Sequence, residues 1–131
     1  MTTEEVSVHQ MIEQAERKRS GIIYLACPYT HPDHRVRARR YREATKAAAK
    51  LIGQGLIVFS PITMTHPIDV ELSEQHSTQG SAFWVRFDEA FMAFCDEMVV
   101  LRIEGWYESD GVTRERQFFE KLGRPITYLD P

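Results

Sequence analysis

Four short apolar runs, each flanked by residues that favour turns, alternate with stretches of helical periodicity along this chain. The runs occupy residues 22–27, 56–59, 98–101 and 125–129. All four are interpreted as strands, and the unbroken runs at 22–27 and 56–59 are typical of strands that are buried on both faces, as in a parallel sheet. Because parallel neighbours are joined by a crossover helix, the alternation predicts a doubly wound α/β sandwich.

Three longer segments repeat apolar residues every three or four positions, which predicts helices over 33–53, 81–95 and 112–122. Residues 60–79 contain two prolines, two histidines and several serines and threonines with little periodicity. We expect a long loop there, with one helical turn near residues 70–74. Loops of this length in compact domains are usually functional or mobile.

The length of 131 residues leaves room for one domain of average size. Residues 4–19 carry a weak helical stripe that ends at Ser20 and Gly21. We therefore expect a helical N-terminal extension over residues 1–20 and a single α/β domain over residues 21–131.

The charge pattern bears on the partners of the protein. A net charge of −3 supplies no positive field for a phosphate backbone, so nucleic acid is not an expected partner. A basic row in the 33–53 helix is interpreted as its solvent face, with a nucleic-acid footprint as the alternative. No apolar stretch approaches the roughly 20 residues of a membrane span, and the acidic N-terminus is unlike a signal peptide. We expect a cytoplasmic protein with no membrane partner.

The two cysteines, Cys27 and Cys95, form no Cys-x-x-Cys pair. We expect buried, reduced thiols, and a structural disulfide or a catalytic thiol are the alternatives. His31 and His34 lack a third metal ligand in sequence, so no metal site is expected. The chain contains neither a glycine-rich dinucleotide loop nor a Walker A motif, and we expect no cofactor.

In open parallel sheets, ligands bind beyond the carboxyl ends of the strands. That rule selects residues 27–33, 60–68 and 102–115. Glu115 is expected in the first turn of the last helix, where the helix dipole favours the ionised carboxylate that a nucleophile requires. The alternative is that Glu115 only complements the dipole.

Two further residues could contribute to this site. Asp88 lies in the middle of a predicted helix, where it is either exposed or able to position a substrate hydroxyl or transfer a proton. Tyr24 lies in the first strand and is most simply a core aromatic whose hydroxyl reaches an edge.

Three segments in this order resemble the nucleoside 2-deoxyribosyltransferase superfamily, which includes the 2'-deoxynucleoside 5'-phosphate N-hydrolases. They are the strand at 23–27, Asp88 with Asp96 eight residues later, and Ser109-x-Gly111-Val112-x-x-Glu115. The chain is most similar to short bacterial and phage members with Ala-Cys-Pro-Tyr after the first strand and His-Pro-Ile after the second, here residues 26–29 and 66–68. The resemblance covers about residues 22–129.

The resemblance implies a flavodoxin-like or Rossmann-like parallel sheet of four to five strands and a homodimer or homotetramer. It also implies an enzyme that cleaves the N-glycosidic bond of a (deoxy)nucleoside or nucleoside 5'-monophosphate, as a transferase or an N-hydrolase. Glu115 matches the nucleophile, Asp88 the acid near the base and sugar, and Tyr24 the tyrosine that orients the Glu. A non-catalytic nucleotide-binding or sensing module on the same fold is the alternative.

The remaining candidates are substrate-binding residues. Ser109 and Gly111 match the segment in which the hydrolases hold a 5'-phosphate with a Ser, and a neutral hydroxyl tolerates that anion. Cys27 and Pro28 stand where the hydrolases have a Gly-Ser pair, and Pro28 offers neither a hydroxyl nor an N–H. In the first loop the expected substitute is therefore Tyr29, Thr30, His31 or Arg35, of which Tyr29 and Thr30 are taken as substrate-binding candidates. His66 belongs to the second matching segment. Trp106 is a candidate for stacking on the base, as are Trp84 and Tyr107.

Overall fold

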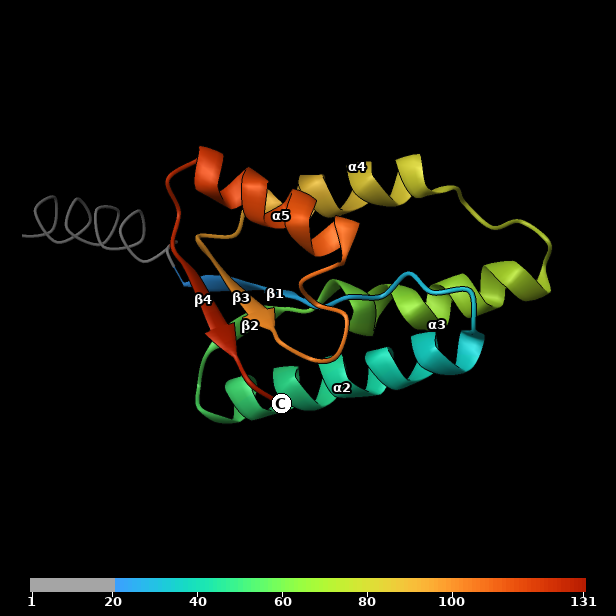
Figure 1. Cartoon of the computed structure of the whole chain (residues 1–131), viewed down its shortest axis with the longest axis horizontal. Helices are drawn as coiled ribbons and strands as arrows, with labels where there is room; N and C mark the ends of the chain where they lie inside the picture. The colour runs from blue at the N-terminus through green and yellow to red at the C-terminus, as the bar shows by residue number, and fades with distance from the viewer. Residues whose placement is uncertain (1–20) are drawn as a thin grey trace, which may run out of the picture.

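A parallel sheet of four strands lies between two pairs of helices in the computed structural model, which describes residues 21–131 (Figure 1). The elements in chain order are β1 (Ile22–Ala26), α2 (His34–Gly53), β2 (Ile57–Phe59), α3 (Pro61–Glu74), α4 (Ser81–Met92), β3 (Glu97–Leu101), α5 (Asp110–Lys121) and β4 (Ile126–Leu129). The doubly wound α/β fold and its four parallel strands are therefore confirmed. The expected helical extension over 1–20 lies outside the described residues.

The strands are arranged in the order β2-β1-β3-β4, and every neighbouring pair is parallel. Side chains along β1 alternate between the two faces of the sheet, because successive residues of a strand point to opposite sides. Ile23 and Leu25 pack on the face that α2 covers. Tyr24 and Ala26 pack on the opposite face, with residues of α4 and α5. Tyr24 therefore lies on the face that α4 and α5 cover, and not on the face that α2 covers.

The crossover connections that follow β1 and β3 leave the centre of the sheet in opposite directions. The helix between β1 and β2 covers one face, and the helix between β3 and β4 covers the other (Figure 1). The strand that follows β1 is added on one side of it and the strand that follows β3 on the opposite side, so the carboxyl ends of β1 and β3 are the topological switch point of the sheet. A crevice is expected at that point, because the loops that follow the two strands diverge there.

Side-chain caps fix the start of the two crossover helices. The Asp33 carboxylate accepts a hydrogen bond from the Arg35 N–H at 2.9 Å, and the Ser109 hydroxyl accepts one from the Val112 N–H at 3.2 Å. Each cap satisfies an N–H that would otherwise have no partner in the first turn. The loops after β1 and β3 therefore end at defined positions above the sheet.

The expectation of a long loop over residues 60–79 is wrong. Most of the segment is the helix α3, which begins with Pro61 in its first turn and continues through Pro67. Pro61 is favourable there because the first helical N–H groups need no intrahelical partner. The Thr63 hydroxyl lies 3.0 Å from that of Thr45 on α2, and this contact joins the two helices through polar groups. Because α3 contacts α2 partly through hydroxyl groups, its sequence does not have the apolar stripe by which a helix is usually predicted.

The expectation that residues 56–59 form a buried strand is only partly right. The strand exists as β2, but it lies at the edge of the sheet, and 63% of Ile57 is exposed. An edge strand has a neighbouring strand on one side only, here β1. The apolar run alone could not distinguish an edge strand from a central one.

Candidate active site

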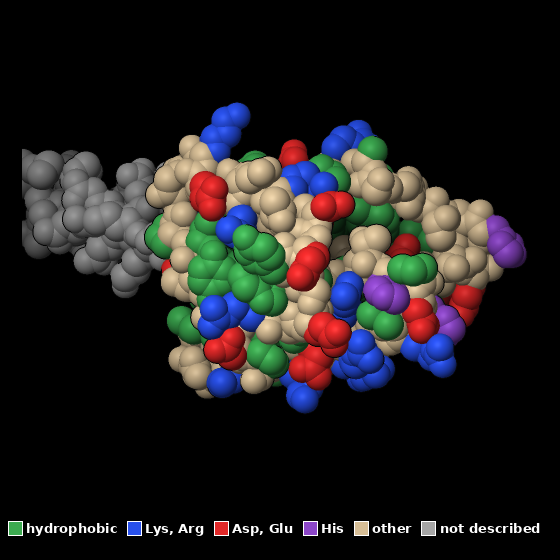
Figure 2. Space-filling model, in the orientation of Figure 1, with side chains coloured by type: hydrophobic (Ala, Val, Ile, Leu, Met, Phe, Trp, Pro, Cys, Tyr) green, Lys and Arg blue, Asp and Glu red, His purple; other side chains and the backbone are tan. Residues whose placement is uncertain are grey.

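A pocket of about 370 Å³ opens at the carboxyl ends of β1 and β3, at the switch point of the sheet. Figure 2 shows the surface hollowed between the two pairs of helices on this side of the molecule. All three segments that the sequence selected contribute to its wall, together with α4. The residues that line the pocket include Tyr29, Thr30, Arg37, Asp69, Ser81, Trp84, Asp88, Ser109, Gly111, Arg114 and Glu115.

Glu115 and Tyr24 form the buried centre of the site. The Tyr24 hydroxyl donates a hydrogen bond to Oε2 of Glu115. Tyr24 is fully buried, and Glu115 is 8% exposed although it lines the pocket. Burial raises the pKa of Tyr24 well above its ordinary value, so the phenol remains protonated and able to donate. The contact therefore joins a strand residue to a helix residue 91 positions later.

The position of Glu115 in its helix differs from the expectation. Because α5 begins at Asp110, Glu115 lies in the second turn and not in the first. The free N–H groups of the helix start are out of its reach, since the dipole effect falls off within the first turn. Burial raises the pKa of Glu115 to about 8, although the Tyr24 hydrogen bond lowers it. The prediction that the helix dipole keeps this carboxylate ionised is therefore wrong.

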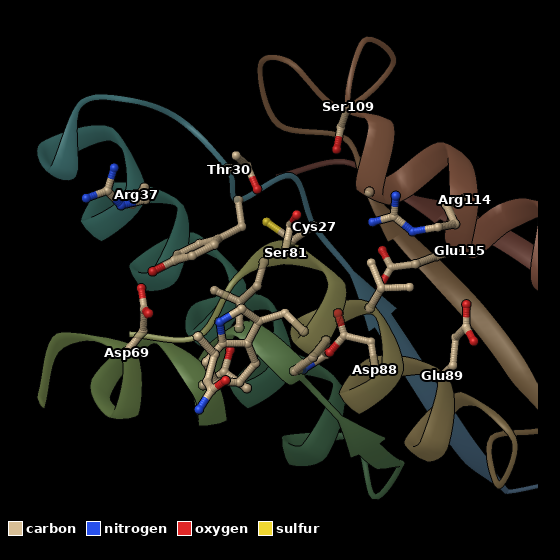
Figure 3. Close-up of a pocket in the computed structure, with 18 of the residues that line it drawn as sticks. Cys27, Thr30, Arg37, Asp69, Ser81, Asp88, Glu89, Ser109, Arg114 and Glu115 are labelled. Carbon is tan, nitrogen blue, oxygen red and sulfur yellow. The ribbon is translucent and has the colours of Figure 1, made fainter. Parts of the chain in front are cut away.

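Asp88 faces Glu115 from α4, across the pocket (Figure 3). Burial raises the pKa of Asp88 to about 6, while the guanidinium of Arg114 lowers it. The charge of Asp88 also raises the pKa of Glu115, which shows that the two carboxyl groups interact. Two interacting acids of unequal pKa hold one proton between them over the intervening pH range. The pair therefore has one ionised and one protonated carboxyl group near neutral pH.

Ser109, Gly111 and Arg114 lie at the start of α5, on the same side of the pocket as Glu115. The Ser109 oxygen accepts the capping hydrogen bond, which leaves its O–H free to donate to a ligand. Arg114 adds a positive charge beside it (Figure 3). This end of the pocket therefore combines donor groups and a cation, which suits an anionic group of a substrate.

Tyr29 and Thr30 also line the pocket, in the loop after β1. His66 does not line it but supports Tyr29, because its Nδ1 lies 2.6 Å from the Tyr29 hydroxyl. The expectation that His66 contacts substrate directly is therefore replaced by an indirect contact through Tyr29.

Trp106 does not line the pocket. Its ring packs edge-on against the rings of Tyr107 and of Tyr128 on β4, with distances between ring centroids of 5.4 Å and 5.7 Å. Figure 2 shows hydrophobic side chains gathered over β4, apart from the hollow. The stacking role expected of Trp106 is therefore not supported, because the loop after β3 folds back onto the sheet edge. Of the expected aromatic residues, Trp84 is the one in the pocket wall.

The two cysteines are free and buried, as expected. Burial raises the pKa of Cys27 to about 12 and that of Cys95 to about 11. Their side chains belong to different cores on the two faces of the sheet, so a disulfide between them is excluded. Within residues 21–131, no three His, Cys, Asp or Glu side chains are grouped as metal ligands. No helix in this range has the length and hydropathy to cross a membrane.

Sequence reasoning missed four charged residues of the pocket wall, namely Arg37, Asp69, Glu89 and Arg114. Asp69 was hidden because its segment was interpreted as a loop, whereas in α3 it follows Thr65 by one turn on the pocket side. One usable signal existed in α4. Ser81, Trp84 and Asp88 recur at three- and four-residue spacing, which places them on one helix face.

These features define a class of protein: a doubly wound parallel α/β domain with an acidic, tyrosine-supported pocket at the carboxyl ends of its central strands. Residues 21–130 match the model of a family described as a domain of unknown function (DUF1937), and the chain belongs to this family. No curated protein matches the chain.

Proposed function

We propose that this protein cleaves the N-glycosidic bond of a (deoxy)nucleoside or nucleoside 5'-monophosphate, with Glu115 as the nucleophile. The observation that carries the proposal is the convergence of Glu115, Asp88 and Tyr24, which come from α5, α4 and β1. The resemblance of these same three positions to the nucleoside 2-deoxyribosyltransferase superfamily supports it independently.

The reaction would proceed in two displacements at the anomeric carbon. In the first, a carboxylate oxygen of Glu115 forms a bond to C1' as the bond between C1' and the base nitrogen breaks. The Tyr24 hydroxyl orients that carboxylate and stabilises its ionised form. In the second, an acceptor attacks C1' and releases Glu115. Water as acceptor makes the enzyme an N-hydrolase, and a free base makes it a transferase.

The leaving base needs a proton, and in this proposal Asp88 supplies it. The singly protonated pair near neutral pH contains one ionised group for attack and one protonated group for donation. By these pKa values the proton lies mainly on Glu115, so the reactive arrangement, with Glu115 ionised and Asp88 protonated, is the less populated one. The Tyr24 hydrogen bond raises the population of this arrangement, because it lowers the pKa of Glu115. Division of the two roles between interacting acids is a common design in glycosidic chemistry.

A 5'-phosphate on the substrate would be held at the start of α5. The free O–H of Ser109 and the guanidinium of Arg114 would donate to it, and the backbone N–H groups of the first turn point the same way. Gly111 lines the same anion site, because a Cβ atom there would be in ordinary contact with both donors, 3.7 Å from the Ser109 hydroxyl oxygen and 3.9 Å from a guanidinium nitrogen of Arg114.

A homodimer or homotetramer is part of the same proposal. Phe94, which follows α4, is 76% exposed, and Ile57 on the edge strand β2 is 63% exposed. Large apolar side chains at these levels of exposure favour burial against another chain. Light scattering during size-exclusion chromatography tests the assembly, and a monomer at micromolar concentration contradicts it.

The test of the activity is release of free base. Purified protein is incubated with the common nucleosides and their 5'-monophosphates, and the products are separated by chromatography. We expect base release by the parent chain and a loss of at least about 100-fold in Glu115→Gln. The matched control is Glu120→Gln, which removes an exposed carboxylate from the same helix. Equal rates for Glu115→Gln and the parent contradict the proposal, and nucleotide binding without base release supports the binding-module alternative.

A further inference from the structure

The end of the pocket opposite Glu115 contains a second pair of charged side chains that the proposed reaction does not use. Figure 3 shows Arg37 and Asp69 at one end and Glu115, Asp88 and Arg114 at the other. The two ends are also electrostatically separate. Asp88 and Arg114 shift the pKa of Glu115, whereas Asp69 and Arg37 shift that of Tyr29.

Arg37 and Asp69 make no ion pair with each other or with any other residue in 21–131. Arg37 donates a hydrogen bond to the backbone carbonyl of His31, and its charge and a side-chain hydrogen bond act against the burial that raises the pKa of Tyr29, so the guanidinium is held at the pocket wall. Asp69 projects from α3 at the same end. A half-buried carboxylate and a half-buried guanidinium that face one cavity leave acceptor and donor capacity for a ligand.

Tyr29 lies between these two charges and is held in place. Its hydroxyl contacts Nδ1 of His66 at 2.6 Å, and the His66 ring in turn packs against Tyr41 at 4.5 Å. Burial lowers the pKa of His66 and raises that of Tyr29 to about 12, so a neutral imidazole accepts from a protonated phenol. This support makes the Arg37 and Asp69 end a rigid wall.

The length of the pocket matches a nucleotide laid along α4. Ser81 and Asp88 line the same wall seven positions apart, which spans about 10 Å of helix. A sugar at Glu115 and a phosphate at Ser109 leave the base to extend toward Asp69. A phosphate at the Asp69 end is disfavoured, because the carboxylate repels it.

Hydrogen-bonding capacity then selects among the bases. A carboxylate only accepts, and its two oxygens are best satisfied by two donors on adjacent atoms. Guanine alone among the common bases presents two adjacent donors, N1–H and the 2-amino group, with the O6 acceptor beside them. Uracil and thymine place acceptors on both sides of their N–H, and adenine and cytosine place an acceptor beside their amino group. The guanidinium of Arg37 supplies the donor that O6 requires.

We propose that Arg37 and Asp69 form a guanine-selective subsite, with Asp69 accepting from N1–H and the 2-amino group and Arg37 donating to O6. This inference rests on the proposed function only for the direction in which the nucleotide lies. It assigns a substrate class, guanine nucleosides and nucleotides, to a pocket whose catalytic end does not distinguish bases.

The test is nucleotide binding by calorimetry in the Glu115→Gln background, in which turnover is removed. We expect GMP to bind about 10 to 100 times more tightly than IMP, which lacks the 2-amino group, and more tightly than AMP, CMP or UMP. Asp69→Asn should abolish the preference for GMP over IMP, and Arg37→Gln should weaken both of these ligands. Glu74→Gln, an exposed change at the end of the same helix, should leave the preference intact.

Three results overturn the subsite: equal binding of GMP and IMP, a preference that survives Asp69→Asn, and binding of no nucleotide. Circular dichroism of each variant separates lost binding from lost folding. Base release by the parent chain is measured separately. A parent that releases no base but shows the Asp69-dependent preference contradicts the proposed activity alone. A parent that releases every base equally, with no effect of Asp69→Asn, contradicts the subsite alone.

Discussion

Replacement of Glu115 by Gln should stabilise the protein at high pH relative to the parent. Glu115 is 8% exposed, and burial raises its pKa from the ordinary 4.5 to about 8. A carboxyl group whose pKa is raised on folding contributes its full stability below the unfolded pKa and loses it as the pH rises through the folded one. Gln is neutral throughout and carries no such dependence. The free energy of unfolding of the parent should therefore fall with pH relative to that of the variant.

The size of the effect follows from the two pKa values. Each pH unit between 4.5 and about 8 costs the parent about 1.4 kcal/mol. The raised pKa of Glu115 therefore destabilises the fold by about 3 kcal/mol at pH 7, where Glu115 stays protonated while the unfolded chain ionises, and by about 5 kcal/mol above pH 8. Loss of the charged partner of Tyr24 adds an offset that is independent of pH, so the slope and not the offset carries the test.

Urea unfolding followed by tryptophan fluorescence measures this slope. We expect the difference between Glu115→Gln and the parent to grow by about 4 kcal/mol between about pH 5 and about pH 8.5. Glu120→Gln, exposed on the same helix, should follow the parent within about 0.5 kcal/mol. Parallel curves for Glu115→Gln and the parent would refute the reasoning, because they would mean that Glu115 titrates as a solvated acid.

Three further predictions concern the same site. Base release should follow a bell-shaped pH profile with limbs near pH 6 and pH 8, because the Asp88 and Glu115 pair lacks an ionised group below that range and a protonated one above it; a flat profile contradicts this. Tyr24→Phe removes the hydrogen bond that lowers the pKa of Glu115, so kcat should fall and the optimum should move to higher pH, and an unchanged optimum argues against the contact. Cys27 and Cys95, whose pKa values burial raises to about 12 and about 11, should react with a thiol reagent at pH 8 only after unfolding, and rapid labelling of the native protein contradicts their burial.

The fold was largely predictable because its strands and helices have different sequence patterns. The strands are short apolar runs, and the helices repeat apolar residues every three or four positions. The central strand β1 is apolar throughout, and β3 is apolar after its first residue, Glu97. The α2 pattern buries Ala44, Ala48 and Leu51 on one face. The sequence failed at α3, because Pro67 and a polar contact to α2 replace the apolar stripe on which helix prediction depends.

The candidate site was predictable in its members but not in its electrostatics. The rule that ligands bind at strand carboxyl ends located Glu115 and Ser109, and structural alternation brought Tyr24 to the correct face. Because α5 begins at Asp110, two residues earlier than expected, Glu115 lies in the second turn. Burial there raises the pKa of Glu115, whereas the expected dipole effect would have lowered it. A shift of that kind depends on tertiary burial, which no local pattern records. Arg37 and Asp69 line the same end of the pocket only because α2 and α3 pack side by side, so their proximity could not be predicted from the sequence either.

The central claim is that a carboxylate oxygen of Glu115 bonds to the anomeric carbon of the sugar. Mass spectrometry of acid-quenched, protease-digested reaction mixtures tests this bond directly. We expect a transient sugar or sugar-phosphate adduct on the peptide that contains Glu115. The Glu115→Gln variant should show no such adduct. Base release with no such adduct, or with the adduct on a different carboxylate, would contradict it.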